Sequence, residues 1–173
     1  MELSQRVWIP VRQALVWQAL NDPEVLKQCL PGCESFDAVA DPVGDAVADP
    51  VGDTEFEVVL IAKVGPVKAK FKGEVILTDV QAPVSYQISG VGKGGVAGFA
   101  KGAAEVSLKS SDDGESTLMS YQVTASVGGK LAQIGSRLVT GAARKMAADF
   151  FTGFVRLLSG DENMTVEIET LET

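Results

Sequence analysis

The sequence feature that most constrains the fold is a stretch of period-two alternation over residues 54–127. Apolar and polar residues alternate along it, as they do in strands that bury one face. Turn sequences interrupt the pattern at Gly65-Pro66, at Ala82-Pro83, in a glycine-rich stretch and at Asp112-Asp113-Gly114. We therefore predict five strands in hairpin succession, which implies an antiparallel sheet.

The first of these hairpins has a definite predicted register. A two-residue loop at Gly65-Pro66 produces three opposed apolar pairs that share one face of the sheet. The pairs are Val64 with Val67, Ala62 with Ala69, and Leu60 with Phe71. The same register opposes two like-charged pairs, Glu57 with Glu74 and Lys63 with Lys68, at a small cost in stability.

The elements on either side of this stretch are also predicted from their patterns. Residues 2–10 alternate as a first strand, and Ala14, Trp17 and Leu20 are spaced as one face of a helix. Asp22-Pro23 is typical of the start of a second short helix, and residues 34–39 form another strand.

The segment 130–159 carries the clearest helical pattern in the chain. Its apolar residues recur at helical spacing, and Ser159-Gly160 ends the pattern. These residues are Leu131, Ile134, Leu138, Ala142, Met146, Phe150 and Phe154. We divide the chain into one domain over residues 1–160 and a polar C-terminal tail over 161–173. The tail alternates weakly at Met164, Val166 and Ile168, which fits either a short strand or a loose end.

The composition excludes several classes of function. The chain has no histidine, so it lacks the usual general base and the usual metal ligand. Its net charge of −8 disfavours nucleic-acid binding. Two cysteines, no leader-like N-terminus and no long apolar run predict a cytoplasmic protein.

Two short motifs resemble ligand-binding motifs, but the residues around them do not support ligand binding. Gly90, Gly92 and Gly95 fit a phosphate-loop spacing, yet a strand follows them instead of a helix, so we predict no nucleotide site. Cys29 and Cys33 lack a second ligand pair, so we predict no metal and no cofactor.

One strand carries an unusual run of small residues. Gly98, Ala100, Gly102 and Ala104 share one face, and the aromatic end of the long helix has to pack over the sheet. Small residues opposite large ones can produce either tight interdigitation or a hollow, and both alternatives stay open. If the hollow exists, its walls should be Leu60, Phe71, Tyr86, Ala100, Ala104, Ile134, Leu138, Met146, Phe150 and Phe154.

A basic strip should lie on the opposite face of the first hairpin. Its members are Lys63, Lys68, Lys70 and Lys72. Such a strip is either a solvated edge or a docking site for an acidic partner or for lipid headgroups.

Several segments of the sequence resemble known proteins. Residues 16–26 (VWQALNDPEVL) and 29–34 (CLPGCE) resemble the opening of START-like, polyketide cyclase-like helix-grip proteins. Residues 63–73, 92–102 and 129–138 resemble the carbon monoxide dehydrogenase G-subunit family, and the likeness covers about residues 1–158. It implies an α+β helix-grip fold. A curved seven-stranded antiparallel sheet would wrap around the long C-terminal helix, with two short helices after the first strand.

The resemblance also implies a role. Family members act as accessory proteins of molybdenum hydroxylases, without accepted catalytic residues, so we assign none. We expect an apolar small molecule in the cavity, with a quinone-like compound as one candidate. The alternatives are a cyclase or aromatase-type enzyme and an assembly factor that binds only protein. Larger members continue into a hydrophobic anchor, whereas here we expect at most peripheral contact with a membrane.

Residues 37–44 are repeated without change as 45–52, and each copy ends in the turn sequence Asp-Pro-Val-Gly. We interpret the repeat as a loop lengthened by tandem duplication. Because loop closure costs only about 0.6 kcal/mol per doubling of loop length, deleting residues 45–52 should shift the Tm by no more than a few degrees. Differential scanning calorimetry measures this shift. A drop of roughly 10 °C or more would show that the repeat packs on the domain.

Overall fold

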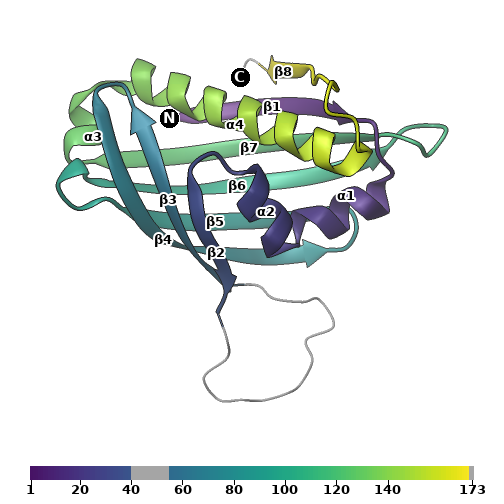
Figure 1. Cartoon of the computed structure of the whole chain (residues 1–173), viewed down its shortest axis with the longest axis horizontal. Helices are drawn as coiled ribbons and strands as arrows, with labels where there is room; N and C mark the ends of the chain where they lie inside the picture. Colours follow the sequence, from purple (N-terminus) through teal and green to yellow (C-terminus); the bar gives the residue numbers. More distant parts are fainter. Residues whose placement is uncertain (40–54, 172–173) are drawn as a thin grey trace.

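The computed structural model describes residues 1–39 and 55–171, so most of the repeat lies outside the described residues. Within them, one antiparallel sheet has the strand order β2-β3-β4-β5-β6-β7-β1-β8, and the helices cover one of its faces (Figure 1). The strands are β1 (Glu2–Ile9), β2 (Cys33–Ala38), β3 (Glu55–Val64), β4 (Val67–Gln81), β5 (Ser85–Lys93), β6 (Phe99–Ser110), β7 (Thr117–Gly128) and β8 (Ile168–Leu171). The helices are α1 (Gln13–Leu20), α2 (Pro23–Cys29), the 3-10 turn η1 (Gly95–Ala97), α3 (Lys130–Gln133) and α4 (Ser136–Ser159).

The predicted α+β fold and the register of its first hairpin are confirmed. Val64 lies opposite Val67 and Leu60 opposite Phe71, across a turn at Gly65-Pro66. The predicted strand count of seven is one too low, because β8 forms in the segment we expected to be a polar tail. β8 pairs with β1, and the Arg6 guanidinium lies 2.7 Å from the Glu169 carboxylate across this pair.

α2 begins where capping chemistry places it, whereas the predicted C-terminal helix needs a correction. The Asp22 carboxylate accepts a hydrogen bond of 3.0 Å from the Glu24 N–H at the start of α2. The single helix predicted over 130–159 is instead two helices, α3 and α4. Gly135 separates them with a φ of 95°, outside the helical region, and Gly160 ends α4 in the left-handed conformation.

Two buried clusters hold the layers together. The larger lies between α4, α1 and the sheet, and its most deeply buried side chains include Val7, Ile9, Phe56, Phe154 and Val155. The smaller consists of Phe71, Ala97 and Leu131, with Ile134 and Val127 among the side chains packed on it. It joins the β3–β4 hairpin, η1 and α3 at one end of the sheet.

The turn between β5 and β6 approaches the start of α3 closely. Gly98 has a φ of 105°, and a Cβ at this position would overlap the carbonyl oxygen of Gly128. Only glycine fits this crossing, since both the conformation and the space exclude a side chain.

We therefore expect Gly98→Ala to destabilise the protein by about 2–4 kcal/mol in urea unfolding. Gly95→Ala is the matched control, because Gly95 also has a positive φ but nothing lies within 4 Å of its added Cβ. The control should cost only about 1–2 kcal/mol, the conformational penalty alone. Equal losses for the two variants would contradict the close approach.

Candidate ligand-binding cavity

The inner face of the sheet is built in layers that the strand register sets. Tyr86, Val106 and Tyr121 form one layer across β5, β6 and β7. The next layers along the strands are Ile88–Ala104–Val123 and then Gly90–Gly102–Ala125. Side-chain volume thus falls sharply along the face, and the third layer has almost no side chains.

A cavity of about 490 Å³ lies between this face and the helices. It is lined almost wholly by carbon, and this size is typical of small-molecule sites. The helical part of its wall is Leu20, Leu26, Ala143, Met146, Ala147, Phe150 and Phe151. The strands contribute Leu3, Phe36, Phe56, Val58, Leu60, Val75, Leu77, Tyr86, Ile88, Ala104, Val106, Met119, Tyr121 and Val123, and Met1 and Leu30 complete the lining.

Two phenols are the only polar side chains in this lining. The Tyr121 hydroxyl donates to the side-chain oxygen of Gln5, and the Gln5 amide donates to the Thr170 hydroxyl at 3.0 Å. The Tyr86 ring packs edge-on against Trp17, with 5.4 Å between ring centroids. Its hydroxyl has no hydrogen-bond partner among the described residues. No fully buried side-chain oxygen there lacks a partner, so this hydroxyl borders open space.

Burial governs the ionisation of both phenols. It raises the pKa of Tyr121 to about 12 and raises the pKa of Tyr86 further in the same direction. Both rings are therefore neutral hydrogen-bonding groups at physiological pH. No Asp, Glu, Lys or Arg lines the cavity.

The structure brings together half of the side chains that the sequence suggested as cavity walls. Leu60, Tyr86, Ala104, Met146 and Phe150 all line the cavity.

The other five lie outside the lining. Phe154 is fully buried in the core against Phe150, and Phe71 and Ile134 belong to the smaller cluster. Leu138 is 49% exposed, and Ala100 lies two layers beyond Ala104, opposite Gly92 and Val127. The break at Gly135 explains the positions of Ile134 and Leu138, since it interrupts the single helical stripe that the periodicity assumed.

Most of the wall residues were not among those that the sequence suggested, and two groups of them illustrate why. Tyr121 and Val123 lie on β7 opposite Val106 and Ala104, so extending the strand register by one hairpin would have found them. Leu26 and Leu30, at α2, reach the cavity through the packing of that helix against β2 and α4. No periodicity in the sequence marks that packing.

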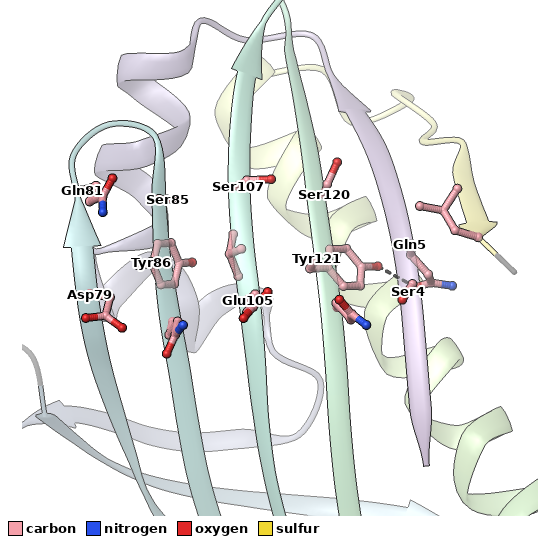
Figure 2. A pocket seen from close by; sticks show the side chains of 14 residues that line it. Ser4, Gln5, Asp79, Gln81, Ser85, Tyr86, Glu105, Ser107, Ser120 and Tyr121 are labelled. Atoms are coloured by element: carbon pink, nitrogen blue, oxygen red, sulfur yellow. Dashed lines mark hydrogen bonds between the residues drawn. The ribbon is translucent and has the colours of Figure 1, made fainter. Parts of the chain in front are cut away.

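A second hollow, of about 530 Å³, lies on the other face of the sheet. Figure 2 shows its side chains, among them Ser4, Asp79, Gln81, Ser85 and Glu105, projecting from neighbouring strands. These residues are hydrophilic, and most belong to the solvated positions of the strands. The hollow therefore suits water better than an apolar ligand.

The remaining residues that the sequence singled out lie away from the cavity lining. Lys63, Lys68, Lys70 and Lys72 are exposed, and the Lys70 ammonium lies 3.0 Å from the Glu34 carboxylate. Cys29 and Cys33 are both unpaired thiols, and burial raises the pKa of each. Among residues 1–39 and 55–171, no three Cys, Asp or Glu side chains are arranged to hold a metal ion.

The sheet, the C-terminal helix and the apolar cavity between them define the START-like helix-grip class. The structure is similar to a START superfamily protein from Mycobacterium smegmatis, with a TM-score of 0.67 and 12% identity over 92% of this chain and 97% of that one. It is also similar to the Zhui aromatase/cyclase from Streptomyces sp. R1128, with a TM-score of 0.63 and 10% identity over 92% and 93%.

Within this class, residues 6–159 match the family model of the carbon monoxide dehydrogenase G subunit (CoxG), and the chain belongs to that family. A conserved protein from Geobacillus kaustophilus has a similar structure, with a TM-score of 0.81 and 25% identity over 98% of this chain and 99% of that chain. A search of curated proteins finds no sequence relative. None of the described helices has the length and hydropathy needed to cross a membrane.

The two cavity phenols are the only tyrosines in the chain, so the rise in absorbance at 295 nm that accompanies tyrosine ionisation reports on them alone. We expect little phenolate to form in the folded protein below about pH 11, because burial raises both pKa values. In the unfolded chain the phenols titrate near their ordinary pKa of 10.0. Stability should therefore be intact below pH 10 and fall as the pH rises toward 12. Tyr86→Phe and Tyr121→Phe should each flatten this loss, and ordinary titration in the native state would contradict the burial.

Proposed function

We propose that the protein binds an apolar small molecule in the cavity beneath α4. We further propose that it serves as a non-catalytic accessory protein of a molybdenum hydroxylase related to carbon monoxide dehydrogenase. The observation that carries the proposal is the cavity of about 490 Å³ with an uncharged, nearly all-carbon lining. Membership of the CoxG family supports the association with such an enzyme.

A catalytic role finds little chemical support in the cavity wall. General acid–base catalysis needs a group that titrates near the working pH. The wall offers only two phenols whose pKa values are raised away from neutrality. They can donate or accept hydrogen bonds but hold their protons, which suits recognition of a ligand.

A quinone-like ligand fits this wall. Its planar apolar body would contact Met146, Phe150 and Ile88. Its carbonyl oxygen would accept a hydrogen bond from the Tyr86 hydroxyl, which has no partner among the described residues. The Tyr121 hydroxyl already donates to Gln5, so only its lone pairs remain available to a ligand.

Two alternatives remain to be tested against this proposal. An aromatase or cyclase activity is favoured by the structural similarity to the Zhui enzyme and by the two phenols in the cavity. An assembly factor that binds only protein would need no ligand at all. Native mass spectrometry of the purified protein, followed by extraction, distinguishes a co-purifying small molecule from an empty chain.

Replacing Ala104 with tryptophan tests the cavity directly. Ala104 lines the cavity, so the indole of Ala104→Trp should occupy ligand space and cost less than about 1 kcal/mol. Uptake of the neutral fluorophore N-phenyl-1-naphthylamine, measured by its emission, should be abolished. Ala103→Trp is the matched control, since Ala103 is exposed on the opposite face of the same strand and should leave uptake unchanged.

A filled core would give the opposite result. Ala104→Trp would then destabilise the protein by about 1–3 kcal/mol through overpacking. If the unaltered protein also failed to take up the fluorophore, the ligand-binding role would be wrong and the protein-only assembly factor would be favoured.

A further inference from the structure

Like charges lie side by side on the outer face of the sheet, which is the face opposite the helices (Figure 1). Asp37 on β2, Glu57 on β3 and Glu74 on β4 occupy directly opposed positions, and we call them the acidic row. Two residues further along the strands, Lys72 lies directly opposite Lys93 on β5, and we call this pair the lysine row. Directly opposed like charges destabilise a sheet, so each row carries a cost that its strand pairing does not offset.

The described part of the chain offers the two rows no compensating ion pair. All five side chains are exposed. Among residues 1–39 and 55–171, none of the five has an oppositely charged group within 4 Å. The repulsion within each row is therefore not relieved by ion pairs inside the described domain.

The two rows meet at a hollow of about 490 Å³ on the outer face. Lys72 and Glu74 line this hollow, together with the two valines that lie directly opposite them. Val59 on β3 faces Lys72, and Val91 on β5 faces Glu74. Val91 is 40% exposed, so apolar surface lies between the charged groups. The hollow has room for long side chains of a partner, and burial of its apolar flanks would favour association.

Lys72 and Glu74 make this surface complementary to itself. They are two residues apart on β4, so their side chains lie on the same face of the sheet, on either side of Gly73. In a two-fold symmetric pair, residue i of one copy contacts residue j of the second copy, and j contacts i. An axis that crosses β4 at Gly73 would therefore place Lys72 of each copy beside Glu74 of the other. One rotation thus produces two ion pairs from a single surface.

We propose that the outer face of β3, β4 and β5 is the interface of a homodimer, in which the acidic row of each copy faces the lysine row of the other. A second copy of this chain is the favoured partner because the surface carries both signs of charge in adjacent rows. A single two-fold axis then relieves the repulsion in both rows, whereas a partner of one sign would relieve only one of them. The interface is independent of the proposed ligand, since the cavity lies on the opposite face of the sheet.

Sedimentation velocity of the whole chain, with charge reversals at the two central residues, tests the proposal. At about 100 µM protein we expect a dimer in about 50 mM NaCl and its dissociation in about 500 mM NaCl. Lys72→Glu and Glu74→Lys should each weaken association by roughly tenfold or more, because like charges then meet twice across the axis. Within the monomer, each variant instead places opposite charges on paired strands, facing Lys93 or Glu57 respectively, so its Tm should not fall.

Mixing the two variants gives the decisive measurement. Each should be monomeric alone, whereas an equimolar mixture should form a heterodimer, because both central contacts across the axis then join opposite charges. The matched controls are Lys109→Glu and Glu105→Lys, which are exposed on the same face of β6 and should leave association unchanged. The proposal is overturned if the unaltered chain is monomeric at low salt or if the controls weaken association equally. A mixture that stays monomeric while the unaltered chain dimerises would also overturn it and place the dimer interface elsewhere.

Discussion

One helix is too narrow to cover an eight-stranded sheet, and the rest of the structure follows from that mismatch. Eight strands span roughly 34 Å at their usual spacing, whereas a helix with its side chains is about 10–12 Å wide. The sheet must therefore curve around α4, and other elements must cover the remaining inner face. α1 and α2 cover part of it, and they do so from a position early in the chain, between β1 and β2.

The space that side chains leave unfilled between these helices and the sheet is the cavity. The layer of Tyr86, Val106 and Tyr121 and the layer of Ile88, Ala104 and Val123 both line it, whereas the next layer, of two glycines and one alanine, lies outside the lining. Ala104 is the smallest side chain of the two lining layers, so the sheet leaves room there. Phe71 and Leu131 also lie outside the lining, in the smaller cluster.

The features that depend on neighbouring residues were predicted correctly from the sequence. The features that depend on contacts between distant segments were not. The hairpin at Gly65-Pro66 and the cap at Asp22 follow from neighbouring residues, and both form as predicted. The break at Gly135 was missed because the apolar spacing continues through it. β8 was left open between a strand and a loose end, because four residues with weak alternation become a strand only when β1 offers them an edge. The same reason limited the prediction of the cavity wall. Residues on a predicted strand or helix face were found, whereas the residues that α2 contributes were not.

The position of β1 in the strand order has a consequence for how the chain folds during synthesis. β1 is made first, yet its partners are β7 and β8, and Leu3 pairs with Val123. Until β7 leaves the ribosome, both edges of β1 are without their sheet partners, and the buried face of Leu3, Val7 and Ile9 has no core to join. Long-range pairing of this kind slows folding and exposes an unpaired strand to aggregation. The strands that are made last therefore complete the sheet beside β1. Until they pair with it, the N-terminal strand of the nascent chain stays exposed to aggregation.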